Sequence, residues 1–168
     1  MSDPHKRYRA TVVVVNSEDG RLLLVRDKGK HRFSMPGGGF KYNESTILAS
    51  VREIVEEVSG LTVMSVERLP HCDFEGRRAH HKVCRVIASG HPQVRQPHEI
   101  DKVVWWDMKS ELRVQGHVRY ILSKIQALQS RLVVGHQTLN LSTQVRVLPL
   151  EPTRVRGVAA WIRRLCFG

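Results

Sequence analysis

The sequence predicts a mixed α/β (α+β) fold, in which helices pack against a mixed central sheet, followed by a C-terminal extension. Two runs of β-branched and aliphatic residues stand at the start of the chain, and two later segments repeat apolar residues at helical spacing. Further short apolar runs lie between those helical segments. Strands on both sides of a helix, combined with hairpins, are typical of a sandwich of sheet and helices.

The first two strands are expected at Tyr8–Val15 and Arg21–Arg26. The five residues between them, NSEDG, are turn-forming types, so the two strands are expected to form a hairpin. A basic loop at residues 27–32 comes next and leads into the segment PGGGFKYNESTILASVREIVEEVSGL, which begins at Pro36. Three glycines stand there directly before the densest acidic cluster of the chain.

An amphipathic helix is expected within this segment. Ile47, Val51, Ile54 and Val58 recur at spacings of four, three and four, which predicts an apolar stripe on one helical face. Ser45 can cap the amino end because its hydroxyl can accept a hydrogen bond from a free amide of the first turn. Gly60 is the expected stop at the carboxyl end.

Later strands are expected at Leu61–Arg68, Lys82–Ala88 and Lys102–Trp106, with a turn at Glu75-Gly76. A second helix is expected at Gly116–Leu128. Its apolar face comprises Val118, Ile121, Leu122, Ile125 and Leu128.

The domain is therefore expected to span residues 1–130, and residues 131–168 are expected to form a basic C-terminal extension. This extension holds six Arg and one Glu, and we expect it to contain a strand and an amphipathic helix at Thr153–Phe167. Docking on the domain or on the second subunit of a homodimer is the favoured role of that helix. Attachment to nucleic acid or to a membrane surface is the alternative.

The overall charge and the cysteine content indicate the kind of partner and the compartment. The 27 Lys and Arg outnumber the 16 Asp and Glu, which gives a formal net charge of +11 and favours polyanionic partners such as nucleotides. The three cysteines form no CxxC pair, which is typical of reduced thiols in a cytoplasmic protein. The apolar run Val12–Val15 is too short for a membrane span or a signal segment.

Three carboxylates crowd one side of the first predicted helix. At about 100° per residue, Glu53, Glu56 and Glu57 project nearly opposite to the apolar stripe. A solvated acidic face is the simpler interpretation of this feature alone, because such faces tolerate the weak repulsion between like charges. A hard divalent cation would make the same cluster favourable, and glycines nearby could bring backbone carbonyls to that cation.

The combined spacing is more specific than either feature. The chain has Gly38, then Glu44 after five residues, and then REIVEE (Arg52 to Glu57) after seven more residues. This pattern resembles the box of the Nudix (MutT-like) hydrolase family. The resemblance implies an α/β/α sandwich and an enzyme that cleaves a diphosphate linkage in nucleoside diphosphate derivatives by attack of water at phosphorus. It also implies Mg²⁺ or Mn²⁺ as the cofactor and a nucleotide-type small molecule as the substrate.

Roles in this box are implied by the same resemblance. Metal ligation is implied for Glu53, Glu56, Glu57 and Gly38, and catalysis for Glu53 and Glu57. The supporting residues are expected to be Arg52 and Glu44, as an ion pair, together with Gly37.

Three positions of this chain depart from the family pattern. Ser59 stands where the box continues with glycine, and Gly60 and Leu61 are displaced by one residue. Asn43 stands where glycine is common, and asparagine is the residue that best tolerates a positive φ after glycine. Lys41 replaces a frequent acid. These departures leave all the metal carboxylates in place.

Outside the box, the resemblance implies a further catalytic acid or base at Glu99, with Asp101 as the second choice; a solvated loop acid is the alternative interpretation of Glu99. The resemblance also implies that Arg26 binds substrate phosphate, and an ordinary surface arginine is the alternative there. Stacking on the substrate base is expected from Phe33, Phe40 and Trp105, with Tyr42 and Phe74 as further candidates. A zinc site is disfavoured for His71, Cys72, His80, His81 and Cys84, because their spacing fits no common finger.

The sequence leaves two functional interpretations open. The favoured one is a metal-dependent pyrophosphohydrolase that acts on a nucleoside triphosphate, normal or oxidised, or on a nucleotide sugar or ADP-ribose-type substrate. The alternative is a non-catalytic nucleotide sensor with the same fold, or a regulator associated with nucleic acid. The complete carboxylate set favours the enzyme, because a sensor has no chemical need for it.

Overall fold

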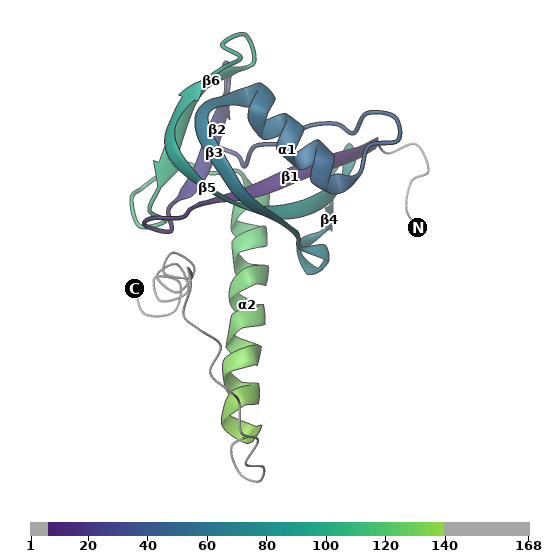
Figure 1. Cartoon of the computed structure of the whole chain (residues 1–168), viewed down its shortest axis with the longest axis vertical. Coiled ribbons are helices and arrows are strands. Elements are labelled where there is room, and N and C mark those ends of the chain that lie inside the picture. Colours follow the sequence, from purple (N-terminus) through teal and green to yellow (C-terminus); the bar gives the residue numbers. More distant parts are fainter. Residues whose placement is uncertain (1–6, 140–168) are drawn as a thin grey trace.

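The computed structural model describes residues 7–139 as one sheet with a helix on each face (Figure 1). The six strands are β1 (Arg7–Asn16), β2 (Leu22–Asp27), β3 (Val58–Arg68), β4 (Phe74–Glu75), β5 (Ala79–Val94) and β6 (Ile100–Trp106). The helices are α1 (Thr46–Glu57) and α2 (Gly116–Leu139), and a 3₁₀ turn covers Pro70–Cys72.

The sheet is mixed, as predicted, with the strand order β3-β5-β1-β2-β6 and with β4 paired to β5. β1 runs parallel to β5 along its whole length, from Arg7 opposite Ala79 to Asn16 opposite Ala88. The other pairs are antiparallel. β1 and β2 form the predicted hairpin but pair only at Val15 and Leu22, so they separate beyond that point.

Two apolar clusters lie on the two faces of the sheet, because alternate residues of β1 point to opposite sides. Val12 and Val14 pack in the cluster that contains Ile54 of α1. Val13 and Val15 pack in the cluster that contains Val118, Ile121 and Ile125 of α2. This arrangement confirms the predicted α/β/α sandwich.

The glycine segment fills the gap where β1 and β2 separate. On one side, the amides of Ala10 and Val12 in β1 donate to the carbonyls of Gly38 and Pro36, at 2.8 and 2.9 Å. On the other side, Ser34 and Val25 of β2 exchange two backbone hydrogen bonds of 2.8 and 2.9 Å. Gly37 and Gly38 are thereby held in the middle of the sheet, beside Glu57 and Glu53 in the last turns of α1.

Helix α1 begins as predicted, because the Ser45 hydroxyl accepts a hydrogen bond from the Leu48 amide at 3.2 Å. Its predicted end at Gly60 is wrong. The helix ends at Glu57, since Val58 is already extended and pairs with Val94 in the sheet. Gly60 instead lies in β3 at a shift of register, with φ +77° and with no room for a side chain against the His91 carbonyl. Gly60, which stands one residue later than the glycine of the family box, is thus accommodated by a β-bulge.

The predicted apolar stripe of α1 is only partly correct. Ile54 is buried, but Ile47 is 45% exposed, whereas two of the acids, Glu53 and Glu57, are buried. The side of α1 that faces the glycine segment therefore carries carboxylates, and a simple pattern of apolar residues does not identify it.

Helix α2 starts at the predicted residue, Gly116, and continues to Leu139, beyond the expected end at Leu128 and beyond residue 130 (Figure 1). β5 is also longer than the expected Lys82–Ala88 strand. The predicted helix at Thr153–Phe167 lies outside the described residues. No helix within residues 7–139 is long and apolar enough to cross a membrane.

Candidate active site

One part of the site is the backbone turn at Gly37 and Gly38, which precedes α1 in the sequence. Gly37 has φ +148°, and a Cβ atom there would lie 2.1 Å from the Ala10 carbonyl oxygen, so only glycine fits. A Cβ atom on Gly38 would lie 2.3 Å from the carboxylate of Glu53. The backbone at Gly38 and the Glu53 side chain are therefore in direct contact, which joins the turn to α1.

Arg52 connects the same two elements, and it forms the predicted ion pair with Glu44. Its Nε and Nη2 atoms donate to the two Glu44 oxygens at 2.7 and 2.8 Å, and Nη2 also donates to the Gly39 carbonyl at 2.8 Å. Its Nη1 atom bridges Glu53 at 2.7 Å and Glu56 at 3.0 Å. One guanidinium thus orients the loop and two of the three box glutamates.

These contacts set the charge of the surrounding acids. The Arg52 guanidinium lowers the pKa of Glu44 to about 2, and the Glu44 contact in turn raises the pKa of Arg52. Burial acts to raise the pKa of Glu56, but hydrogen bonds from Lys41 and Arg52 outweigh it, and the pKa falls. Lys41, which replaces a frequent acid of the box, lies 3.2 Å from the Glu56 carboxylate.

Glu53 and Glu57 are the buried acids of the site, at 8% and 7% exposed. Glu57 accepts a long hydrogen bond of 3.4 Å from the Gly37 amide, and no residue in the described part of the chain forms an ion pair with it. Burial, and then the nearby charge of Glu53, raise the pKa of Glu57 to about 8. A buried carboxylate held beside another one is a position that a cation would stabilise.

The donor chemistry of this cluster fits a hard divalent cation, which prefers carboxylate and carbonyl oxygens. Glu53 and Glu57 lie beside the Gly37-Gly38 backbone, and Glu56 lies on the outer side of the same helix. Among residues 7–139, however, no three His, Cys, Asp or Glu side chains are already gathered around one point. The Gly38 carbonyl, a predicted ligand, accepts the hydrogen bond from Ala10.

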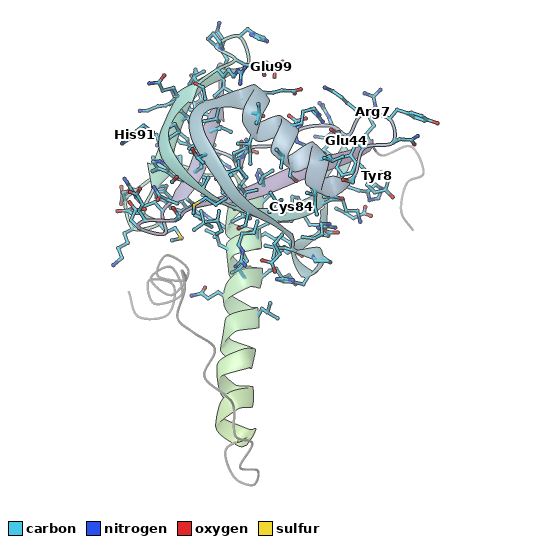
Figure 2. All side chains as sticks on the ribbon, viewed as in Figure 1. Arg7, Tyr8, Glu44, Cys84, His91 and Glu99 are labelled. Atoms are coloured by element: carbon cyan, nitrogen blue, oxygen red, sulfur yellow. The ribbon has the colours of Figure 1, made fainter. Side chains whose placement is uncertain are left out.

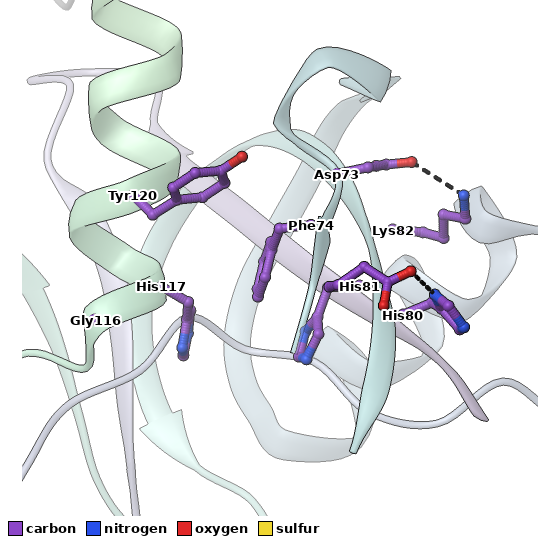
Figure 3. Close-up of a pocket in the computed structure, with 9 residues that line it drawn as sticks. Asp73, Phe74, His80, His81, Lys82, Gly116, His117 and Tyr120 are labelled. Atoms are coloured by element: carbon purple, nitrogen blue, oxygen red, sulfur yellow. Dashed lines mark ion pairs between the residues drawn. The ribbon is translucent and has the colours of Figure 1, made fainter. Parts of the chain in front are cut away.

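A cavity of about 670 Å³ lies between the β4–β5 hairpin and the first turns of α2 (Figure 3). The ring of Phe74 stacks on His81, with ring centres 4.2 Å apart, and lies 6.0 Å from His117 and 5.7 Å from Tyr120. Desolvation by burial lowers the pKa of His81 to about 4 and also lowers that of His117. The cavity wall is therefore aromatic and uncharged at neutral pH on this side.

Arg9 of β1 has neighbours in both the glycine turn and the cavity wall. It donates a hydrogen bond to the Gly37 carbonyl, and it lies opposite His81 in the pairing of β1 with β5. Its charge lowers the pKa of Glu57, His81 and His117. Arg9 thus connects the turn that contacts Glu57 to a residue that lines the cavity. Arg9, His117 and Tyr120 were not predicted from the sequence; the aromatic and histidine residues at the start of the second predicted helix were the available signal.

The five residues considered for zinc do not point to one site. Cys84 is buried towards α1, where its thiol lies 3.9 Å from the Thr46 carbonyl. His81 points to the other face of the sheet and shares a 2.9 Å hydrogen bond with Thr11.

The candidates for base stacking differ in exposure. Phe33 is only 5% exposed, in the core cluster under α2, and Arg26 covers its ring at 5.5 Å. This burial does not favour its predicted role in stacking. Phe40 is half-buried near Tyr8, and Trp105 is half-buried with its indole donating to the Gly90 carbonyl at 3.1 Å. Their roles remain predictions.

The charged candidates outside the box are held by other partners. Arg26 and Asp101 form a two-fold ion pair, at 2.8 and 3.2 Å. Glu99 is exposed, and its carboxylate lies 3.6 Å from the His98 ring nitrogen. Figure 2 shows Glu99 in the loop above the end of α1, whereas Glu44 lies nearer the start of that helix. The same loop is attached to α1 by the Arg95 amide, which donates to the Glu57 carbonyl at 3.0 Å.

Comparisons with known proteins agree with this geometry. The NUDIX domain family profile matches residues 6–122. No curated protein sequence matches the chain. Among solved structures, a MutT Nudix hydrolase from Burkholderia pseudomallei is similar at 22% identity and a TM-score of 0.58, covering 71% of this chain and 98% of that one.

Two further solved structures have the same fold. A protein described as a putative Nudix hydrolase family member from Chromobacterium violaceum is 23% identical, with a TM-score of 0.56, over 83% of this chain and 97% of that one. An Ap4A hydrolase from C. elegans is 20% identical, with a TM-score of 0.51, over 74% and 98%. Since the family profile covers most of the described chain and the box residues meet at one site, the protein belongs to the Nudix family and is a hydrolase of phosphoric anhydride bonds.

Proposed function

We propose that the protein is a pyrophosphohydrolase that requires Mg²⁺ or Mn²⁺ and cleaves a diphosphate linkage in a nucleoside diphosphate derivative. The observation that carries this proposal is the pair of buried acids, Glu53 and Glu57, beside the glycine turn. Arg52 pairs with Glu53 but not with Glu57, so the charged form of the second buried carboxylate is unfavourable unless it binds a cation.

Glu53, Glu56 and Glu57 would hold the divalent cation, with the Gly38 carbonyl as a further ligand. When bound, the cation would lower the pKa of the attacking water and neutralise charge on the phosphate oxygens. Arg52 holds Glu53 and Glu56 in position. Glu57, or Glu99 from the adjacent loop, would accept the proton of the water.

Arg9 and the aromatic cavity would bind the remainder of the substrate. Arg9 donates to the Gly37 carbonyl, next to the amide that donates to Glu57, so it can contact a phosphate that is bound at the acids. Phe74 offers a ring for stacking on a base, next to two uncharged histidines. The size of the cavity, about 670 Å³, is in the range of small-molecule sites.

The substrate is proposed to be a nucleoside triphosphate, normal or oxidised, or a nucleotide sugar or ADP-ribose-type compound. The structural relative from C. elegans is described as an Ap4A hydrolase, which is also an enzyme of a nucleotide derivative. A non-catalytic nucleotide sensor is the alternative, and the complete set of box carboxylates is the observation against it.

The test is hydrolysis of a nucleotide panel with Mg²⁺ and with Mn²⁺, comparing wild type with Glu57→Gln. The wild type is expected to release pyrophosphate, or a nucleoside monophosphate, only when metal is present. Glu57→Gln should reduce the rate by roughly 100-fold or more, because it removes a metal ligand and a proton acceptor. Glu111→Gln, at an exposed position, serves as the control and should be unaffected. Tight binding without turnover of any nucleotide would favour the sensor.

A further inference from the structure

A basic groove adjoins the aromatic cavity and is not used by the proposed reaction. It consists of two neighbouring hollows of about 350 and 410 Å³. The charged or titratable residues that line them are Lys30, His31, Arg32, Arg113 and Arg119. Among the described residues no acid lines either hollow, so the groove has one sign of charge.

The backbone brings these cations together from distant parts of the chain. The Phe33 amide donates to the Arg113 carbonyl at 2.8 Å, and the Gln115 amide donates to the Phe33 carbonyl at 2.8 Å. This pairing places Arg32 beside Arg113, and Arg119 is on the first turns of α2. None of Lys30, Arg32, Arg113 and Arg119 forms an ion pair with a residue in the described chain. Their charges are therefore available to an anion in solution.

The groove is a neighbour of the cavity, and the cavity is a neighbour of the glycine turn. Arg9 donates to the carbonyl of Gly37, whose amide donates to Glu57, and it lies opposite His81 of the cavity wall in the sheet. Gly116 lines the cavity and both hollows of the groove, so the cavity joins the groove at that residue. A nucleotide with its phosphates at the acids and its base in the cavity would end where the groove begins. The cations of the groove lie beyond the cavity, where they fit further phosphates that are attached to the nucleoside on the side away from the buried acids.

We infer that the basic groove binds the sugar-phosphate backbone of a short single-stranded nucleic acid, whose terminal nucleotide occupies the aromatic cavity. A single strand is required because the base must be unstacked to lie against Phe74. Cations in a groove next to an aromatic ring are the combination that such strands recognise. The inference depends on the proposed function in one respect, which is that a nucleotide occupies the cavity.

An anionic membrane is the less favoured partner for the same charges. Binding to a membrane surface combines basic residues with exposed apolar side chains that enter the lipid. Within residues 7–139, the only aliphatic side chain that lines the two hollows is Val114, and it is buried. The groove is therefore concave and polar, as suits a chain of phosphates.

The test is the binding of a single-stranded RNA octamer, labelled at its 3′ end, measured by fluorescence anisotropy in EDTA so that no hydrolysis occurs. The groove variant is Arg32→Glu/Arg113→Glu. The matched control is Lys102→Glu/Lys109→Glu, which changes the net charge equally at exposed positions outside the groove. The groove variant should bind at least about tenfold more weakly at 0.1 M salt, and the salt dependence of log K should fall by about 1.4, or about 0.7 for each lost phosphate contact.

Three results would overturn the inference. They are equal weakening in both variants, unchanged binding in the groove variant, and groove-dependent sedimentation with phosphatidylserine vesicles in place of RNA binding. Hydrolysis of a mononucleotide separates the two proposals, because both variants should retain it. Groove-dependent RNA binding by a protein that hydrolyses nothing would support this inference and contradict the proposed enzyme.

Discussion

The backbone of Gly38 contacts the Glu53 carboxylate, and this contact predicts the effect of adding a single methyl group at Gly38. In Gly38→Ala the new Cβ atom would lie 2.3 Å from the Glu53 carboxylate, so the carboxylate must move. Gly39→Ala is the matched control, because no described atom lies within 4 Å of a Cβ atom there. We expect Gly38→Ala to lose roughly tenfold or more in kcat/KM, and Gly39→Ala to lose little. Equal activity of the two variants would show that the position of Glu53 is not critical.

Glu57 gives a prediction about the pH dependence of stability without metal. Its pKa is about 8 in the folded protein and 4.5 ordinarily, so between these values the unfolded chain has lost the proton and the folded chain retains it. The free energy of unfolding should therefore fall as the pH rises through this range, by on the order of 5 kcal/mol at about 1.4 kcal/mol per pKa unit.

Urea unfolding in EDTA at pH 5 and pH 8 measures this change. Glu57→Gln cannot ionise, so it should lack this part of the fall and become the more stable protein at pH 8. Adding Mg²⁺ at pH 8 should raise the stability of the wild type and not that of the variant. Parallel pH curves for the two proteins would contradict the assignment of Glu57 as a buried acid.

At the scale of elements, the Arg52 side chain connects the glycine loop to α1. Arg52 binds both Glu44 oxygens and the Gly39 carbonyl, and it is only 18% exposed, with Glu44 at 11%. Arg52→Lys keeps the charge but cannot reproduce the two-fold contact. We expect a loss of roughly 2 kcal/mol in the free energy of unfolding.

The matched control for this pair is Arg21→Gln, which removes a more exposed ion pair with Asp19 and should cost below about 1 kcal/mol. Arg52→Lys should also reduce kcat/KM, because Glu53 and Glu56 lose their common donor. Chemical denaturation together with steady-state kinetics measures both effects. A variant as stable and active as the wild type would exclude Arg52 as the link between loop and helix.

The elements show what could be predicted from the sequence and why. The capping hydroxyl of Ser45 and the recurring apolar residues predicted α1, and the β-branched runs predicted β1 and β2, because these signals are local. The buried side of α1 was predicted incorrectly at Glu53 and Glu57, since their burial depends on the glycine segment packed between β1 and β2. Asn43 adopts the positive φ, +56°, that its identity suggested.

The cavity could not be predicted in the same way. Phe74 and His81 pair within the β4–β5 hairpin, but His117 and Tyr120 belong to α2 and meet them only because that helix crosses the face of the sheet that carries the hairpin. Arg9 gave no signal either, because an arginine in an exposed strand start is ordinary. Residues that belong to one box were therefore recognisable, whereas those that long-range packing brings together were not.

At the scale of the whole molecule, we expect the catalytic domain to be separable from residues 131–168. Ile125 is the last buried residue of α2 in the described core, and Leu128 is already 40% exposed. All the residues proposed for catalysis, for the cavity and for the basic groove precede residue 125. The expected boundary at residue 130 lies shortly after Ile125, the last residue found buried among the α2 side chains described up to Leu128, although the helix itself continues to Leu139.

Removal of residues 131–168 should accordingly leave nucleotide hydrolysis unchanged, with a free energy of unfolding within about 1 kcal/mol of the full chain. A chain that ends at Lys124 is the control, because it also removes the buried Ile125 and should lose roughly 2–4 kcal/mol. Steady-state kinetics and urea unfolding of the three chains measure this. The longer truncation should be the less stable of the two, since it removes Ile125 from the core under α2. If the chain that ends at residue 130 loses its fold or its activity, the extension is part of the catalytic domain.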